Sequence, residues 1–396
     1  NTDIIQTLID LGADIHIQNN DVFYRAARSV SPDIMIPFFL KKGFDPNIKN
    51  ERGYPAIISL ASNVNDNEGI AISAMIEAGV DVNAKDLASG RTALMAARRG
   101  KIIKKLLDAG ADINMKTQEG ETALFEAVLG DQEGVRLLLQ AGADPNASND
   151  KGETVLIHAA DHGVGVETIK LLLSAGADVN ARMNDGTTAL IENQKRNKFD
   201  VLKVLIEAGA DVNAQKDDGT TALIAANTFN AIKILIEAGA DVNLSRKDGK
   251  TALMNAVELD FNPFMEPLPD YDFSSPSNKG AIDLLLKAGA DINAEMNDGT
   301  TALMLACAAD RTSGNKDVLV KTLIEAGANV NAKTKDGLTA LINAAGEEGT
   351  ATFVVNYAEK LFEVKDSEIR YTSENRDMKK CAREAALAVA RNWNPG

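Results

Sequence analysis

The chain has 396 residues, of which 45% are hydrophobic, 5% aromatic and 25% charged. Its 42 Lys and Arg residues and 57 Asp and Glu residues give a formal net charge of −15, which repels phosphate backbones and argues against nucleic acid as the main partner. No apolar run reaches the roughly 18 residues that a membrane span needs, and two cysteines are too few for a disulfide framework.

The first two segments of the chain are expected to form irregular two-helix units. Residues 1–11 have the apolar spacing of a second helix whose partner would lie before Asn1, so we expect a truncated first unit and a native protein that starts earlier. Residues 19–47 carry two helical patterns, and Pro37 is expected to interrupt the second of them.

A short phrase then recurs along the chain, consisting of a helix end followed by Gly-Ala-Asp, an apolar residue and Asn. Clear copies begin at Gly110, Gly142, Gly176, Gly209, Gly239, Gly289 and Gly327, with looser copies at Gly12, Gly43 and Gly79. The intervals cluster around 33 residues, which indicates a repeat protein. A glycine at this point suits a helix C-terminus, where the backbone enters the left-handed region.

A second phrase follows each copy and reads Asp-Gly-Thr-Thr-Ala-Leu in its fullest form, at residues 185–190, 218–223 and 298–303. Asp-Gly is typical of a tight turn, and the Thr before Ala-Leu can cap the next helix. A short alanine-rich helix and a second, more apolar helix are expected to follow. One such unit cannot bury its apolar face alone, whereas stacked units bury it jointly.

In this order of turn, Thr-Ala-Leu, two helices and Gly-Ala-Asp-Val-Asn, the repeat resembles the ankyrin repeat over residues 1–345. The resemblance implies an all-α, right-handed ankyrin-repeat solenoid of about ten helix-turn-helix units with hairpin-like turn tips. The family's Thr-Pro-Leu-His is Thr-Ala-Leu followed by an apolar residue here, so packing is expected to replace the histidine-mediated link between turns. The residues at this histidine position are Met95, Phe125, Ile157, Ile191, Ile224, Met254, Met304 and Ile342.

Two segments depart from the repeat. Residues 260–277 form an insertion with four prolines, which is expected to leave the stack as a loop. A loop of this length either binds a partner or covers its own repeat. Residues 346–396 follow the last repeat and are expected to form its last helix and an amphipathic C-terminal helical cap at 378–391, with a separate docking helix as the alternative.

The resemblance also implies a non-catalytic scaffold that binds another protein in a groove lined by turn tips and short helices. Aromatic and arginine residues are the expected anchors, because such residues dominate interface energetics. They are Tyr54, Arg91, Arg99 and Phe229, with Phe261, Phe264, Tyr271 and Phe273 in the inserted loop. The acidic chain should bind a partner with a neutral or basic surface, as an inhibitor or immunity-type partner that covers another protein's site, and should be a monomer by itself.

Other interpretations stay open. His158 and His162 are spaced so that both imidazoles lie on one helix face, which is the arrangement of a metal pair, although no third ligand is evident. A secreted effector that binds a host protein is a further alternative. No phosphate-binding loop or nucleophile motif is present, so we expect no cofactor and no catalysis. We expect a cytoplasmic protein, and the incomplete N-terminus leaves a periplasmic or secreted location open.

A cluster of basic residues stands out in this acidic chain. Its members are Arg98, Arg99, Lys101, Lys104 and Lys105. It is either a solvated helix face or a contact for an acidic patch on a partner.

Overall fold

The computed structural model describes residues 2–11, 13, 21–66, 68–259, 277–308 and 315–345. This part of the chain is built of helices, with isolated β-bridges in place of strands. None of its helices is both long enough and apolar enough to cross a membrane. The chain divides into two compact units, residues 1–217 and 218–396, and each is described by itself.

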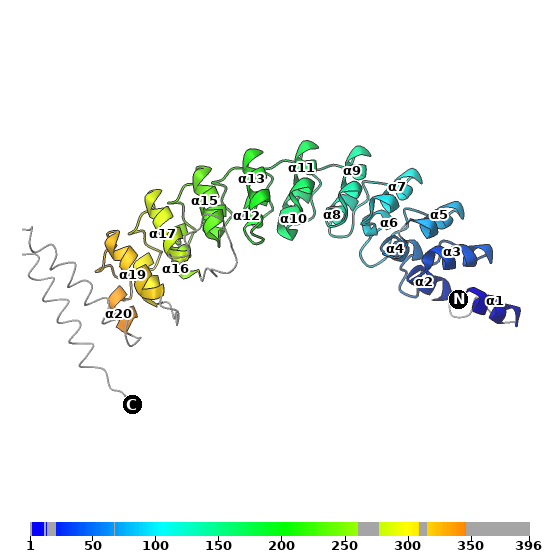
Figure 1. Ribbon diagram of the computed structural model, residues 1–396, viewed down its shortest axis with the longest axis horizontal. Helices are drawn as coiled ribbons and strands as arrows, with labels where there is room; N and C mark the ends of the chain where they lie inside the picture. The colour runs from blue at the N-terminus through cyan, green and yellow to red at the C-terminus, as the bar shows by residue number, and fades with distance from the viewer. Residues whose placement is uncertain are drawn as a thin grey trace, which may run out of the picture. The chain divides into compact units, whose positions relative to one another are not determined.

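The helices of the first unit are coloured blue to green in Figure 1. They are α1 (Thr2–Asp10), α2 (Asp21–Ala27), α3 (Pro32–Lys41), α4 (Ala56–Ala61), α5 (Ile70–Glu77), α6 (Ala93–Ala96), α7 (Gly100–Asp108), α8 (Ala123–Ala127), α9 (Gln132–Gln140), α10 (Val155–His162), α11 (Val166–Ser174), α12 (Ala189–Asn193) and α13 (Phe199–Glu207). The second unit contains α14 (Ala222–Ala225), α15 (Phe229–Glu237), α16 (Ala252–Glu258), α17 (Ser277–Lys287), α18 (Ala302–Ala308), α19 (Asn315–Glu325) and α20 (Ala340–Ala345).

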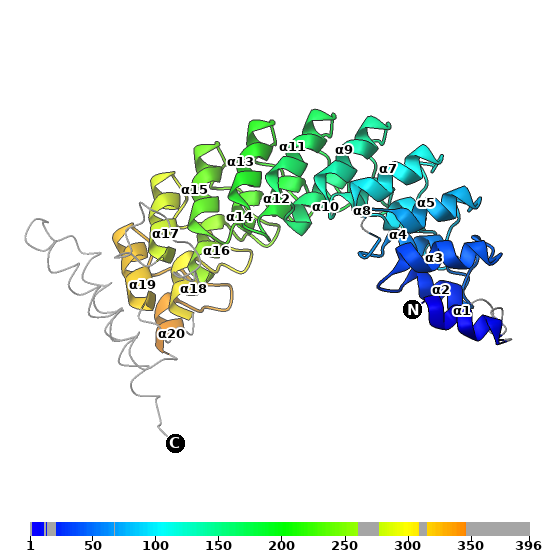
Figure 2. The same cartoon turned by 45° about the vertical axis from the view of Figure 1, so that its right-hand side comes forward.

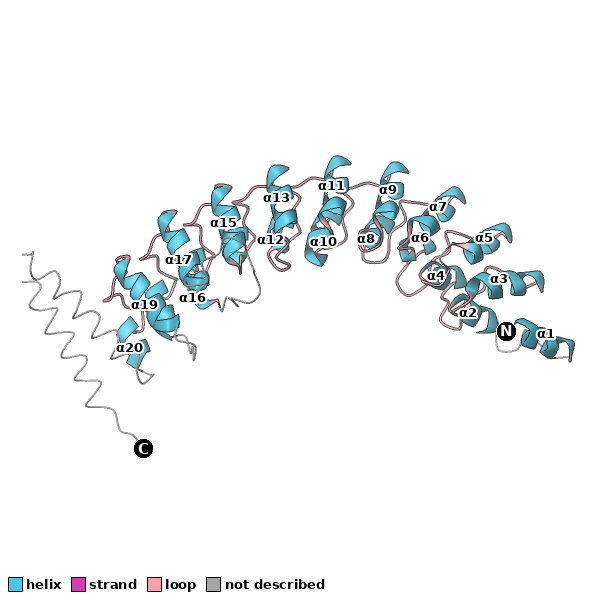
Figure 3. Cartoon of the chain, in the orientation of Figure 1, coloured by secondary structure: helices cyan, strands magenta, loops and turns pink. Residues whose placement is uncertain are grey.

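Within each unit the helices form two layers, which can be followed in Figures 1 and 2. In the first unit α2, α4, α6, α8, α10 and α12 pack in series as the short-helix layer, and α3, α5, α7, α9, α11 and α13 pack in series as the long-helix layer. In the second unit α14, α16, α18 and α20 form the first kind of layer, and α15, α17 and α19 form the second. Figure 3 shows the loops that join the helices.

The repeated phrases begin and end these helices as the sequence predicts. Thr154 is the N-cap of α10, and its hydroxyl accepts a hydrogen bond from the Ile157 amide at 3.4 Å. Thr188 and Thr221 cap α12 and α14 in the same way. At the other end of the repeat, Gly176 follows α11 with φ +94°, in the left-handed region that an L side chain rarely adopts.

The turn tips are hairpin-like and are joined to one another by backbone hydrogen bonds. Isolated bridges close tips at Lys49–Pro55 and Ser148–Thr154 in the first unit, and at Ser245–Thr251 and Glu295–Thr301 in the second. In the first unit the Asp150 amide donates to Glu119 O at 3.0 Å, which joins two successive tips. In the second unit the Lys247 amide donates to Asp218 O and the Asn297 amide to Asp248 O, so successive tips are joined there as well.

A ladder of asparagines, which we call the asparagine ladder, links successive repeats at the long-helix ends. Asn146 Nδ2 donates to Gly176 O at 2.9 Å, and its Oδ1 accepts from the Asp178 amide at 2.7 Å. The same pair of bonds is made by Asn83 with Gly110 and Asp112, by Asn180 with Gly209 and Asp211, and by Asn243 with Gly289 and Asp291. One amide side chain thus satisfies both the carbonyl of a helix-ending glycine and the backbone of the next turn.

The core lies between the two layers, and the residues at the family's histidine position contribute to it. Met95, Phe125, Ile157 and Met254 are at most 1% exposed, so packing does replace a histidine link there. Ile342, at the same position of α20, is 45% exposed.

The expected interruption at Pro37 is wrong, because α3 runs from Pro32 to Lys41 without a break. A proline inside a helix removes one backbone hydrogen bond. Burial of the neighbouring Ile36 and Phe39, with Phe39 lying edge-on to Phe23 at 6.4 Å, holds the helix together across it. The predicted loop, apart from Ser277 at the start of α17, and the predicted C-terminal cap lie outside the described residues.

Candidate protein-binding surface

The turn tips and the exposed side of the short-helix layer in the first unit carry a row of aromatic, charged and histidine side chains. These side chains come from two positions of each repeat: the residue before the N-cap of the short helix and the residue four places after that N-cap. We call this row the tip face. It consists of Tyr54, Ser59, Arg91, Glu121, Glu126, Glu153 and His158, with Tyr24 of α2 at its edge.

Tyr54 stands at the end of the tip face that belongs to the early repeats. Its ring meets that of Tyr24 edge-on, with centroids 6.5 Å apart, and Tyr24 Oη accepts a hydrogen bond from Ser59 Oγ at 2.8 Å. Partial burial raises the pKa of the Tyr54 phenol, an effect that nearby Arg91 opposes. Two tyrosines with fixed rings and accessible edges suit an interface, because each offers a large contact area at little cost in conformational entropy.

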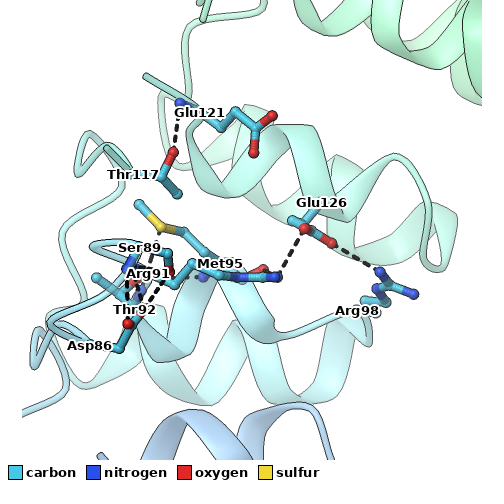
Figure 4. Close-up of polar contacts among 9 residues, drawn as sticks. All are labelled: Asp86, Ser89, Arg91, Thr92, Met95, Arg98, Thr117, Glu121 and Glu126. Atoms are coloured by element: carbon cyan, nitrogen blue, oxygen red, sulfur yellow. Dashed lines mark hydrogen bonds and ion pairs between the residues drawn. The ribbon is translucent and has the colours of Figure 1, made fainter. Parts of the chain in front are cut away.

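Arg91 lies on the next tip, and the turn beneath it is organised by one buried carboxylate. Asp86 accepts hydrogen bonds from the amides of Ser89 and Arg91 and from the Ser89 hydroxyl (Figure 4). It also accepts one from the Ala88 amide. Burial alone would raise the pKa of Asp86, but the hydrogen bonds from Ser89, Ala88 and Arg91 lower it, so the carboxylate is the stable form.

The Arg91 side chain is held over the short-helix layer by an ion pair with the following repeat. Arg91 Nη2 lies 2.9 Å from Glu126 Oε1, and Arg98 binds the other oxygen of the same carboxylate at 3.1 Å (Figure 4). The Arg91 side chain is 34% exposed and the Glu126 side chain is 19% exposed, so the pair is partly desolvated. The guanidinium is therefore positioned before any partner arrives.

Further along the tip face, His158 contacts side chains of its own repeat and of the preceding repeat. Its Nδ1 lies 3.0 Å from Glu153 Oε1, and this hydrogen bond lowers the pKa of Glu153. The imidazole packs against Phe125 at 5.3 Å and against His162 at 4.1 Å between ring centroids. Burial raises the pKa of Glu121, and its carboxylate neighbours, Glu153 among them, add to the rise.

The last repeat of the first unit carries a further ion-paired group beside the tip face. Lys195 binds Glu192 on its own repeat and reaches Asp161 Oδ1 of the preceding repeat at 3.5 Å. Burial raises the pKa of Glu192. Burial also acts to raise that of Asp161, but Lys195 lowers it. The tip face thus offers aromatic edges at one end and partly buried carboxylates along the rest.

The structure brings together only some of the expected anchors. Tyr54 and Arg91 lie on neighbouring tips of the tip face. Arg99 is instead the N-cap residue of α7, in the loop between the two helices of its repeat. Phe229 lies in the second unit as the first residue of α15, where a Cβ at Gly280 would be 3.4 Å from its ring. Phe261, Phe264, Tyr271 and Phe273 lie outside the described residues.

Sequence reasoning missed Tyr24, Glu126 and the partly buried environment of His158. The signal for the last two was the position four residues after the cap, which is Ala96 or Ala225 in some repeats and Ser59, Glu126, His158 or Glu192 in others. Variation at one position of an otherwise uniform repeat marks it as a surface that does not serve packing alone.

Of the histidine pair, His162 is exposed, whereas the His158 side chain is only 14% exposed. Each Nδ1 has a protein partner, Glu153 for His158 and the His158 carbonyl for His162. Across the residues that the structure covers, no three His, Cys, Asp or Glu side chains gather into a group suited to a metal ion.

Comparison with known proteins assigns the repeat. A family model of ankyrin repeats in three copies matches residues 58–149, 142–216, 194–268 and 274–365, which is more than half of the chain. Among solved structures, the crystal structure of the ankyrin repeat domain of Bcl-3, a member of the IkappaB protein family, is 28% identical. The match covers 54% of this chain and 96% of that chain, with a TM-score of 0.44.

Proposed function

The chain belongs to the ankyrin-repeat family, and from this premise we propose that its first unit binds another protein through the tip face. Ankyrin repeats are in general protein–protein interaction scaffolds, and the all-α fold class expected from the sequence is confirmed. The number of about ten units stays a prediction.

The pre-organisation of charged side chains on successive tips is the observation that supports this proposal most. Arg91 is held by Glu126, and Glu153 is held by His158. Side chains that are already fixed lose little conformational entropy on binding, so they favour recognition over mere solvation. These polar contacts lie outside the core, which is built mainly of alanine and aliphatic residues with a few phenylalanines.

The charge of the face supports a partner with a basic or neutral surface. Glu121, Glu126 and Glu153 lie on it, and the whole chain carries a net charge of −15. Nucleic acid is disfavoured for the same reason. In this proposal the protein acts as an inhibitor or immunity-type partner that covers another protein's site, without catalysis or cofactor, as a monomer in the cytoplasm.

Affinity capture from the native cell lysate with the full chain tests the proposal when two matched double variants are compared. Tyr54→Ala/Arg91→Ala changes the tip face and leaves Glu126 paired with Arg98. Lys104→Ala/Lys170→Ala changes two exposed lysines on the long-helix layer, with side chains 62% and 53% exposed.

We expect the wild type and the lysine variant to recover the same partner, identified by mass spectrometry, and the tip-face variant to lose at least about tenfold of it. Equal recovery by all three proteins, at equal thermal stability, would contradict binding through the tip face.

A further inference from the structure

A second exposed surface lies at the opposite side of the short helices from the tips, where the loop inside each repeat joins its two helices. Four aliphatic side chains stand there on the two earliest two-helix repeats. Val30 is 83% exposed, Val64 65%, Ile34 56% and Ile70 49%. We call these four residues the early-loop patch.

Hydrogen bonds between the two loops place these side chains next to one another. Asn63 Nδ2 donates to Ala27 O and Ser29 O, both at 2.9 Å, so the residues that follow, Val64 and Val30, flank the same bonds. Ile34 lies in the first turn of α3 and Ile70 begins α5, and these two helices pack side by side. The four side chains thus stand at the same end of two neighbouring repeats.

The patch is held rigidly from below. Asp66 is 1% exposed, and its carboxylate accepts the Ala71 and Ile72 amides at 3.2 and 3.1 Å, which fixes the start of α5. Branched aliphatic residues that are half to four-fifths exposed contribute little to the core. Exposed aliphatic residues grouped in this way mark an interaction site more often than a folding requirement.

The charged residues beside the early-loop patch indicate which kind of partner binds to it. Along the same edge lies an open depression of about 660 Å³, lined by Arg98, Arg99, Lys101, Glu68 and Leu129 and by Asp131. The Asp131 carboxylate is occupied by the Gly100 and Gly134 amides. This leaves an edge rich in cations on a protein that is acidic as a whole.

The ion pairs at this depression are exposed and exchangeable. Lys101 binds Glu68 at 2.8 Å with side chains 62% and 65% exposed. An exposed pair of this kind contributes little to stability, so a carboxylate of a partner can replace Glu68 at small cost. The Arg98 side chain is also 58% exposed, although its partner Glu126 is only 19% exposed.

We propose that this edge binds a linear segment of a partner protein in which aliphatic or aromatic residues are followed by acidic ones. The apolar residues rest on the early-loop patch and the carboxylates reach Arg98, Arg99 and Lys101. The early-loop patch shares no residue with the tip face, so the Val30 and Val64 substitutions test this proposal separately. Arg98 links the two surfaces through its ion pair with Glu126.

Selection of random linear peptides, displayed on phage, against the immobilised full chain tests this inference. The most enriched peptide is then synthesised, and its affinity is measured by fluorescence anisotropy for the wild type and for Val30→Glu/Val64→Glu. Two controls accompany it: Leu87→Glu, an aliphatic residue 72% exposed at a turn tip, and the tip-face variant Tyr54→Ala/Arg91→Ala.

The expected peptide combines apolar and acidic residues, weakens about tenfold or more on the early-loop variant, and binds both controls as it binds the wild type. It should also weaken on Arg98→Ala/Arg99→Ala. Peptides that bind the early-loop variant unchanged, or that lose affinity only on the tip-face variant, overturn the inference. So does concentration-dependent self-association of the wild type that Val64→Glu abolishes, because the patch is then covered by a second copy.

Discussion

At the scale of single residues, the asparagine of the repeated phrase has the clearest structural role. The sequence motif predicts why glycine follows the long helices, because glycine adopts the left-handed backbone more readily than any other residue. It gives no account of the asparagine, because Asn146 bonds to Gly176 and Asp178 in the next repeat. A partner about thirty residues away cannot be inferred from a local pattern.

Replacing Asn146 by Ala should lower the free energy of unfolding by about 0.5–1.5 kcal/mol, because the Gly176 carbonyl and the Asp178 amide, both on exposed residues, lose their side-chain partner. Urea unfolding followed by circular dichroism measures this. Gln140→Ala, at an exposed position on α9, is the control and should change stability by less than about 0.5 kcal/mol. Equal effects of the two substitutions would show that the ladder is dispensable.

Asn197 has φ +54° and is the one non-glycine residue with positive φ in the described part of the chain. Gly163 takes the corresponding place in the preceding repeat, with φ +63°. Asn197→Gly should therefore leave stability unchanged or raise it, and Asn197→Ala should lower it by about 1 kcal/mol. The difference in urea midpoint between these two variants checks the assignment, and a more stable alanine variant would refute it.

Asp185 makes the stability of its tip depend on acid. Burial alone would raise the pKa of its carboxyl, but hydrogen bonds from Thr187 and Lys216 hold it at about 2, below the ordinary 3.8. A lowered pKa stabilises the folded state above the ordinary value, and that contribution is lost as pH falls from about 4 to about 2. Asp185→Asn should thus be less stable than the wild type near neutral pH, with a difference in urea midpoint that closes near pH 2. A difference independent of pH would mean that the charge contributes nothing.

At the scale of helices, the repeat predicts where most helices begin. The N-cap threonines show how far this prediction extends to individual hydrogen bonds. Thr154 accepts the Ile157 amide, whereas Thr122 in the same motif makes no such side-chain bond. The two hydroxyls are similarly buried, at 7% and 9% exposure of the residue. The motif alone cannot separate them, because the bond depends on the final orientation of each turn.

Thr154→Ala should therefore lower the free energy of unfolding by about 1 kcal/mol, and Thr122→Ala by clearly less. Urea unfolding of both variants under the same conditions decides this. A larger loss at Thr122 would contradict the capping geometry.

Helix α3 shows where sequence reasoning fails at this scale. Pro37 predicts a break, yet Ile36 and Phe39 are fully buried on either side of it and Phe39 packs against Phe23 and Phe44. Tertiary packing outweighs the loss of one backbone hydrogen bond, and no local rule weighs the two. The same early repeats carry the exposed Val30 and Val64, which periodicity also does not reveal.

At the scale of the whole molecule, the sequence predicts the repeat architecture well and the binding surface only partly. The period and the two phrases suffice for the family, because every repeat must solve the same packing problem. Tyr54 and Arg91 follow from their residue types and tip positions. Glu126 and His158 become visible only when the structure places them beside Arg91 and Glu153.

The described residues place the proposed interaction surfaces outside the uniform turns. Tips such as Asp185 to Thr187 and Asp298 to Thr300 share nearly the same residues, and uniform tips carry little specificity. The tip face and the early-loop patch both draw on repeats that depart from the common wording. The residues that differ from the common repeat sequence should therefore determine specificity for a partner.

Hydrogen–deuterium exchange of the full chain, alone and saturated with the captured partner, tests the central claim most directly. We predict slower amide exchange on binding at the tips of the first unit, in residues 50–54, 86–91 and 117–121. The long helices α7, α9 and α11 should exchange at the same rate in both states. Protection confined to those long helices, with the tips unchanged, would contradict binding through the tip face.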